Sequence, residues 1–131
     1  MKVIQYLESI HLPIVHEWWE GWGWDKMPPN FLPEIGAVAY NDDDIPVAAA
    51  WLYQTDSAIA IIDWYVTSPK IRGKARNGYI EEITKRLCGI AKELGFLQAY
   101  TFVRNPHLIK RLEKEGFTLT DKDVNIYIRS L

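Results

Sequence analysis

Residues 58–78 constrain the fold most, because they have the pattern of a strand, a cationic turn and the N-terminal end of a helix. The run from Ala58 to Val66 is rich in β-branched and aromatic side chains, which is typical of a central strand. From Tyr79 to Leu94, apolar residues recur with the spacing of one helix face, and Gly95 can end that helix. The turn between them, Pro69 to Gly78, presents backbone N–H groups and four basic side chains at the helix mouth. Such a turn is a place where phosphate binds.

Length and composition limit the classes of protein that fit. The 131 residues suit one domain with one core, and the formal net charge of −2 argues against a general nucleic-acid binder. The one cysteine, Cys88, lies in the apolar-periodic segment, so we interpret it as a core residue in a reducing compartment rather than a catalytic thiol. Residues 1–8 do not resemble a signal peptide, and no run is long enough to span a membrane. We expect a cytoplasmic protein without a membrane partner.

The other segments predict a mixed α/β domain in which helices cover one layer of sheet. Ahead of residue 58 we expect a strand over 2–7, a helix over 10–20 capped by Ser9, a loop over 21–33, and strands over 35–40 and 46–53. The aspartate-rich turn at 41–44 lacks the pattern of a calcium loop, so it is interpreted as a solvated hairpin turn. After Gly95 we expect a strand over 97–103, a helix from Asn105 to about Glu115, and an antiparallel pair over 117–119 and 124–128. The order is β-α-β-β-β-α-β-α-β-β.

Two segments carry a family resemblance. The turn Lys70-Ile71-Arg72-Gly73-Lys74-Ala75 is similar to a (Gln/Arg)-x-x-Gly-x-(Gly/Ala) phosphate loop, and residues 105–117 resemble an Asn-x-x-(small)-x-x-x-Tyr-x-x-x-Gly-Phe helix. Both patterns are those of the GCN5-related N-acetyltransferases (GNAT). The segment from Ala50 to Ser57, with the Trp-rich loop before it, further resembles small phage-encoded members. The resemblance spans nearly the whole chain. It implies one domain over residues 1–131, with a mostly antiparallel sheet of six to seven strands and three to four flanking helices.

The resemblance implies acetyl-CoA or another acyl-CoA as co-substrate, and no metal. Backbone N–H groups from about Arg72 to Arg76 would hold the pyrophosphate, and a nearby basic side chain would meet the 3′-phosphate. In the family the pantetheine arm lies where the fourth and fifth strands splay, here Trp64 to Val66 opposite Thr101 to Val103. Asn105 matches a residue beside that arm, although it equally suits a plain helix cap. The expected donor-binding residues are Trp64, Val66, Lys70, Ile71, Arg72, Gly73, Lys74, Ala75, Arg76 and Asn105.

Asp63 is the candidate general base, because it falls where many family members carry a glutamate on the fourth strand. It is also the only charge in the apolar run, where a bare carboxylate is costly. The alternative is a structural carboxylate, paired with a cation or hydrogen-bonded at a strand bulge. Leu112 replaces the family tyrosine, so the acid that protonates the leaving thiolate must come from elsewhere. Tyr65 is our candidate, with Tyr79 and Tyr100 as alternatives.

The loop over residues 21–33 is expected to cover the acceptor site. Trp22, Trp24 and Phe31 either line an acceptor pocket or clamp the loop onto the core. The acceptor is expected to be a small-molecule amine or an amino group on a protein or modified nucleotide, and the protein a monomer or homodimer. An alternative hypothesis is a catalytically degenerate binding or interaction module that uses this Trp-rich arm. A nucleic-acid contact through the basic loop is a weaker alternative.

Overall fold

The computed structural model describes residues 1–25, 27–73 and 75–131, and they form five strands and three α-helices. The elements in chain order are β1 (Lys2–Gln5), α1 (Glu8–Gly21), a short 3-10 turn η1 (Pro29–Phe31), β2 (Gly36–Tyr40), β3 (Pro46–Tyr53), β4 (Ile59–Thr67), α2 (Ala75–Glu93), β5 (Gln98–Tyr100) and α3 (Pro106–Lys114). The mixed, mostly antiparallel sheet expected from the sequence is confirmed. The expected number of six to seven strands is wrong for the described residues.

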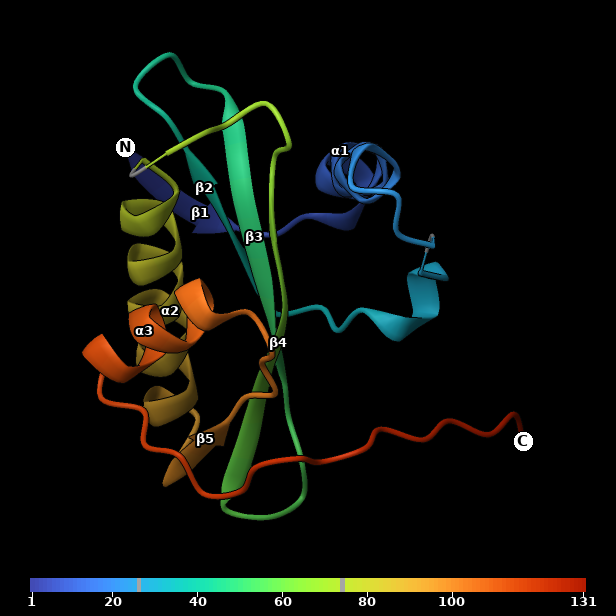
Figure 1. Cartoon of the computed structure of the whole chain (residues 1–131), viewed down its shortest axis with the longest axis vertical. Helices are drawn as coiled ribbons and strands as arrows, with labels where there is room; N and C mark the ends of the chain where they lie inside the picture. The colour runs from blue at the N-terminus through green and yellow to red at the C-terminus, as the bar shows by residue number, and fades with distance from the viewer. Residues whose placement is uncertain (26, 74) are drawn as a thin grey trace.

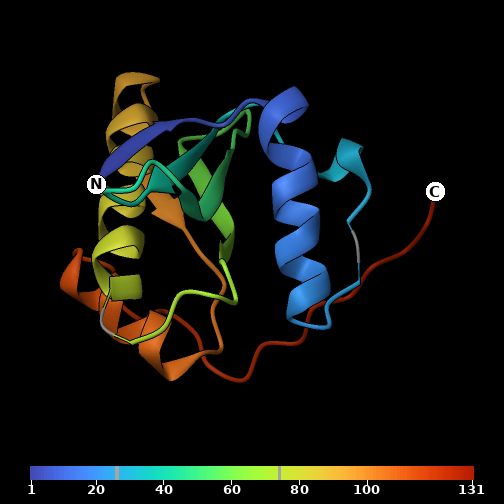
Figure 2. The same cartoon turned by 90° about the horizontal axis from the view of Figure 1, so that it is seen from above.

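The sheet has the order β1-β2-β3-β4-β5, so neighbours in sequence are neighbours in space. The first four strands pair antiparallel, and β5 joins β4 in parallel after the crossover through α2. Figures 1 and 2 show α2 and α3 on one face of the sheet and α1 with η1 on the other. The domain is therefore three layers thick, and each face of β4 looks toward a different set of helices.

Each face of the sheet has its own core. The α2-side core joins Ala60 and Ile62 of β4 to Ile83 and Leu87 of α2, in agreement with the helix face expected over residues 79–94. The α1-side core gathers aromatic side chains instead, namely Tyr6, Trp18, Trp19 and Trp51, with Val66 of β4. Alternating side chains along β4 thus enter two different cores.

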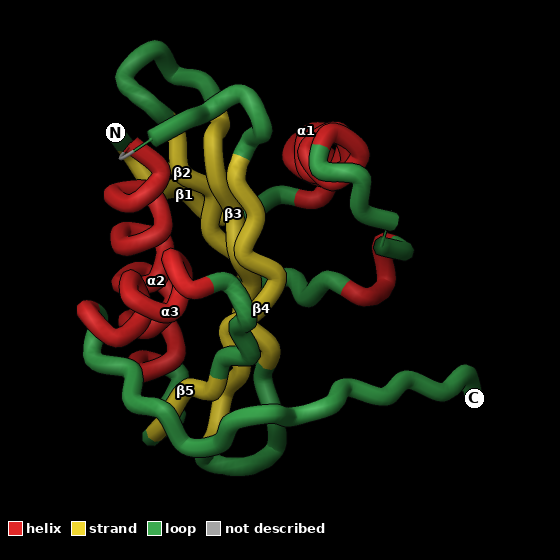
Figure 3. The backbone as a smooth tube through the Cα atoms, viewed as in Figure 1, coloured by secondary structure: helices red, strands yellow, loops and turns green. Residues whose placement is uncertain are grey.

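The expected strand pair at the C-terminus does not form. After α3, residues 117–131 follow an extended path with no strand assigned, and they leave the body as a single tube (Figure 3). The alternation of apolar residues in 124–128 suits a strand, but an isolated ribbon of two short strands is marginal in water without a neighbouring edge or a core. The sequence pattern therefore indicates a capacity to pair, but no strand of the described residues pairs with this segment.

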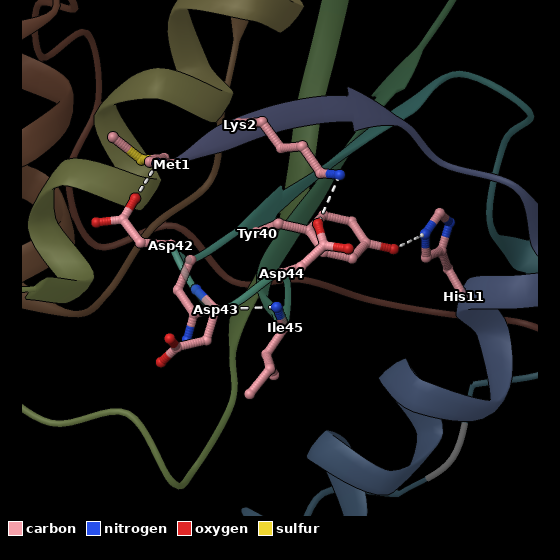
Figure 4. A network of polar contacts seen from close by, with 9 residues as sticks. Met1, Lys2, His11, Tyr40, Asp42, Asp43, Asp44 and Ile45 are labelled. Atoms are coloured by element: carbon pink, nitrogen blue, oxygen red, sulfur yellow. Dashed lines mark hydrogen bonds and ion pairs between the residues drawn. The ribbon is translucent and has the colours of Figure 1, made fainter.

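The N-terminus of α1 differs from expectation, because Ser9 is not its cap. The helix begins at Glu8, and the N–H of Leu7 donates to Nδ1 of His11 at 2.8 Å. Since Nδ1 accepts, Nε2 carries the proton and donates to the hydroxyl of Tyr40 on β2, also at 2.8 Å. His11 is fully buried, and this burial lowers its pKa. It therefore ties α1 to the sheet as a neutral side chain (Figure 4).

The aspartate-rich turn between β2 and β3 is a hairpin turn, as expected. Oδ1 of Asn41 accepts the N–H groups of Asp43 and Ile45, both at 3.0 Å, which closes the turn on itself. Two of the aspartates meet cations of the first strand: Asp44 pairs with Lys2 at 2.6 Å, and Asp42 pairs with the N-terminal ammonium (Figure 4). Two of the acidic side chains thus form ion pairs at the edge of the sheet, as suits a hairpin turn.

Candidate functional site

A β-bulge at Trp64 interrupts β4 and defines the site. Trp51 of β3 pairs with Asp63, whereas Ala49 pairs with Val66, so β4 has one residue more than β3 across this interval. Trp64 takes the extra position with φ +64°, a left-handed conformation that costs a residue with a side chain about 1–2 kcal/mol. Its ring lies 6.2 Å from that of Trp19, on the α1 side. The bulge therefore holds strain in the middle of the longest strand.

The strand β5 leaves β4 shortly before this bulge. Their pairing runs from Ile59 opposite Gln98 to Ile61 opposite Tyr100 and goes no further. Residues 62–67 of β4 consequently have no partner strand on that side among the described residues, although β4 continues to Thr67. The expected contact region for a pantetheine arm, residues 64–66 opposite 101–103, falls in this unpaired interval.

Asp63 is half-buried on the α1 side of the sheet, opposite Trp51. Its Oδ1 accepts the N–H of Trp64 at 2.8 Å. Burial raises the pKa of this carboxyl, and the Trp64 N–H opposes part of the shift. Among the described residues no cation lies within ion-pair distance of it. Of the two structural interpretations of Asp63, the hydrogen bond at a bulge is present and the ion pair is not.

Tyr65 points the other way, into the α2-side core. Its hydroxyl lies 2.9 Å from Oγ1 of Thr84, which itself donates to the carbonyl of Ile80 at 2.8 Å. Burial raises the pKa of Tyr65 well above that of a free tyrosine. The structure thus places the two expected catalytic residues, Asp63 and Tyr65, on opposite faces of the sheet.

Other tyrosines lie on the face of Asp63. Tyr53 of β3 and Tyr100 of β5 both stand in register with Ile61, two residues before Asp63, so all of them share the α1 side. Tyr53 donates to the carbonyl of Phe31 at 2.7 Å, and burial raises its pKa to about 12. Tyr100 is 46% exposed. Strand register, which the sequence pattern does not give, is the signal needed to find this pair.

The cationic turn leads from β4 into the 19-residue helix α2, as expected. Gly73 has φ +73°, and a Cβ built on it meets nothing within 4 Å, so the backbone is open to a ligand there. The N–H groups of Lys70 and Ile71 are used internally by Ser68, at 3.3 and 3.1 Å. The next N–H groups along the chain, those of Arg72 and Gly73, donate no hydrogen bond among the described residues.

The basic side chains of the turn divide into two groups. Lys70 and Arg72 are exposed and suit an anion. Arg76 braces the turn instead, because its Nε donates to the carbonyl of Ile71 at 2.6 Å and its guanidinium lies 5.2 Å above the ring of Trp22. Lys74 and the side chain of Ala75 lie outside the described part of the structure.

The three aromatic residues expected at the acceptor lie in two places. Trp22 and Trp24 stack with centroids 6.2 Å apart, and Nε1 of Trp22 donates to the carbonyl of Thr67 at 2.7 Å. They therefore lie beside the cationic turn. Phe31 lies beside Tyr53, on the face of Asp63, and is about half exposed.

Asn105 is the N-cap of α3. Its Oδ1 accepts the N–H groups of His107 at 2.9 Å and Leu108 at 3.4 Å, and Pro106 takes the first helical position. Leu112, at the position of the family tyrosine, is buried. The cap role of Asn105 is thus confirmed, and its contact with a pantetheine arm stays a prediction.

The fold matches that of solved acetyltransferases, in agreement with the fold that the resemblance to the GCN5-related N-acetyltransferases implies. Similar solved structures include a probable acetyltransferase (TM-score 0.75, 18% identity, 100% of this chain and 99% of that chain). A Mycobacterium tuberculosis protein solved in complex with CoA matches at TM-score 0.74 and 16% identity, over 95% of this chain and 76% of that one. Glucosamine-6-phosphate N-acetyltransferase from Arabidopsis thaliana matches at 0.68 and 12%, over 98% of each chain. No protein-family model and no curated protein matches the sequence.

Other kinds of site find little support in the described residues. No group of three or more histidine, cysteine and carboxylate side chains among them is placed to hold a metal ion. None of the described helices combines the length and apolar character needed to cross a membrane. Burial raises the pKa of the Cys88 thiol, which suits a packing role.

Proposed function

We propose that this protein is an acyl-CoA-dependent N-acyltransferase that transfers an acetyl group to an amine. The observation that carries the proposal is the arrangement at the Trp64 bulge. There a half-buried carboxylate, which no cation of the described residues pairs with, stands beside a length of β4 that β5 has left unpaired. Similar folds described as acetyltransferases support the same class of reaction.

The described residues fit an acyl-CoA molecule. The N–H groups of Arg72 and Gly73 lie ahead of a long helix, whose N-terminus carries a partial positive charge suited to a pyrophosphate. The exposed side chains of Lys70 and Arg72 add the charge that a further phosphate requires. The unpaired backbone of residues 62–67 can hydrogen-bond the amide groups of an extended ligand in the manner of a missing strand. The thioester would then lie close to the bulge.

Asp63 is suited to the proton transfer that the reaction needs. An amine acceptor arrives as an ammonium ion and must lose a proton before it attacks the thioester carbonyl. The raised pKa makes this carboxylate a stronger base than an exposed aspartate. The amine nitrogen then forms a C–N bond with the acyl carbon, the C–S bond breaks, and the sulfur leaves with the electron pair. The nitrogen loses a second proton as the amide forms and the leaving thiolate takes up one proton, so the products are the amide and the CoA thiol. The proton remains on Asp63 until it passes to water.

Tyr100 is our candidate for the acid that protonates the leaving sulfur. Tyr65 is committed to Thr84 on the other side of the sheet, and Leu112 is buried where the family has its tyrosine. Tyr100 is exposed, lies on the face of Asp63 and stands where the two strands part. If Tyr100 has no such role, the missing acid favours the second candidate function, a degenerate module that keeps the fold and binds a partner through its aromatic residues.

The decisive experiment measures acetyl-CoA binding by calorimetry and turnover by release of the CoA thiol with a panel of amines. Asp63→Asn keeps the acceptor for the Trp64 N–H but removes the base. We therefore expect unchanged acetyl-CoA binding and turnover reduced by at least about 100-fold. Asp56→Asn, in the exposed turn before β4, is the matched control and should behave as wild type. Tyr100→Phe tests the acid. Absence of acetyl-CoA binding, or turnover that is indifferent to Asp63→Asn, would overturn the proposal.

A further inference from the structure

Trp24 is an exposed aromatic residue whose backbone is fixed by the end of α1. The N–H of Trp24 donates to the carbonyl of Trp19 at 2.8 Å, and the N–H of Gly23 donates to the carbonyl of Glu20 at 3.0 Å. These two bonds form a glycine cap of the helix, and Gly23 has the left-handed conformation that such a cap requires, with φ +75°. Trp24 is nevertheless 47% exposed. The helix end thus holds in place a large apolar side chain that packing leaves half in water.

The ring of Trp22 joins Trp24 to the cationic turn. The two indoles lie nearly parallel, at 22°, with their centroids 6.2 Å apart. Nε1 of Trp22 donates to the carbonyl of Thr67 at the end of β4, and the guanidinium of Arg76 lies 5.2 Å from the same ring. Trp22 therefore touches the chain on both sides of the turn. The pair of indoles is an aromatic surface attached directly to the proposed phosphate site.

Exposed cations beside exposed indoles suit a nucleotide. Lys70 and Arg72 are exposed and can meet phosphate groups, while a flat indole can stack on a base. Stacking needs no further polar contact, because every base has a π-face. The acyl-CoA donor carries both groups, since a single ribose joins its adenine to the pyrophosphate. A donor whose pyrophosphate lies on the turn must therefore place its adenine close to the turn.

We propose that the indole of Trp24, held against Trp22, is the surface on which the adenine of the acyl-CoA donor stacks. This inference rests on the proposed function, and it moves both tryptophans from the expected acceptor site to the donor site. Phe31, on the face of Asp63, stays with the acceptor. Trp24 contributes affinity and takes no part in the chemistry, because adenine and thioester are at opposite ends of the donor. Its backbone is already fixed by the helix cap, so little order is lost on stacking.

Calorimetry with three probes tests this assignment without relying on turnover. The probes are acetyl-CoA, acetyl-4′-phosphopantetheine, which lacks the adenosine, and adenosine 3′,5′-bisphosphate, which lacks the pantetheine. Loss of one base–indole stack corresponds to a Kd about 5- to 150-fold higher. Trp24→Ala should therefore weaken both adenine-containing probes within this range and leave acetyl-4′-phosphopantetheine unchanged. Trp24→Phe keeps a flat ring and should restore most of the affinity.

Phe31→Ala is the matched control, because Phe31 is exposed to a similar extent (49%) but lies away from the turn. It should leave the binding of all three probes unchanged. If Trp24→Ala binds acetyl-CoA as wild type does, or weakens all three probes alike, the proposal is overturned while the proposed function stands. If wild type binds none of the probes, the proposed function fails and this inference fails with it. Selective loss of the two adenine-containing probes is the result that supports the proposal.

Discussion

Replacing Gly73 by glutamate separates anion binding from backbone strain in the cationic turn. Gly73 has φ +73° and open space where a Cβ would lie, so a side chain fits but is forced into a left-handed conformation. That conformation costs about 1–2 kcal/mol. In a domain of this length, 1 kcal/mol corresponds to about 4 °C in Tm. Without ligand, we expect Gly73→Glu to lower the Tm by about 4–8 °C.

Gly95 offers a matched control at the other end of the same helix. It has φ +94° and also no neighbour within 4 Å of a built Cβ, so Gly95→Glu should lower the Tm by a similar amount. The two variants should differ when acetyl-CoA is added.

Thermal melting with and without acetyl-CoA is the assay. At a concentration 100 times its Kd, a ligand stabilises the folded state by about 2.7 kcal/mol, which corresponds to about 10 °C here. Wild type and Gly95→Glu should gain this shift. Gly73→Glu should gain almost none, because its carboxylate would lie at the proposed pyrophosphate site and repel the phosphates there. An equal acetyl-CoA shift in both glutamate variants would refute the assignment of this turn to phosphate.

Three further predictions follow from individual contacts. Asp63→Asn should raise the free energy of unfolding at neutral pH. The pKa of Asp63 is raised in the folded state, so burying its charged form destabilises the fold. This destabilisation is absent below the unfolded pKa of 3.8, grows as the pH rises, and is complete above the folded pKa. Urea unfolding should therefore show a gain over wild type that disappears on acidification. His11 has a lowered pKa, so stability should fall as the pH drops below 6.5 and level off below the folded value, and His11→Gln should flatten this slope. Asn105→Ala should lower the free energy of unfolding by about 1 kcal/mol, because the helix cap is lost, and should leave acetyl-CoA binding unchanged if capping is its only role. Asn125→Ala, in the exposed segment after α3, is the control.

The parts of the fold that sequence predicts well are those in which local pattern and tertiary packing agree. The run 58–66 became β4, and the apolar spacing after it became the buried face of α2, because each segment has a core to meet on that face. The hairpin turn at Asn41 follows from its own side-chain hydrogen bonds. The segment 124–128 has an equally clear pattern but forms no strand, because a strand needs a neighbouring edge, and no local pattern shows whether one is present.

The site shows the same division between residue chemistry and geometry. Asp63 can be singled out from the sequence, because a lone carboxylate in an apolar run is energetically costly. The side of the sheet on which Tyr65 lies cannot be predicted, because strict alternation along a strand would place residues 63 and 65 on the same side. The extra residue at Trp64 reverses that phase, and a tryptophan at φ +64° gives no signal in sequence of the kind that glycine gives. Sequence therefore draws attention to Asp63 but does not reveal that Tyr65 lies on the opposite face of the sheet.

The end of α1 links the two halves of the candidate site. Trp22 donates to the carbonyl of Thr67, where β4 ends, and its ring supports the guanidinium of Arg76 in the first turn of α2. A Cβ at Gly21 would come within 2.8 Å of Pro69, so α1 also packs closely on the start of the cationic turn. The end of α1 and the cationic turn are thus in direct contact.

Asp63 and Trp64 break two local rules in succession, which is the strongest argument that this point of β4 has a function. Packing does not require either feature: an apolar residue at 63 and a glycine at 64 would remove a desolvated charge and a strained backbone. Each feature is costly, and together they create the bulge whose N–H holds the carboxylate on the face of Tyr100. Natural domains mainly retain such a buried charge and a strained backbone at sites where a reaction or a ligand uses them. The variant Trp64→Gly should accordingly be tolerated by the fold and harmful to turnover, since it relaxes the backbone that orients Asp63.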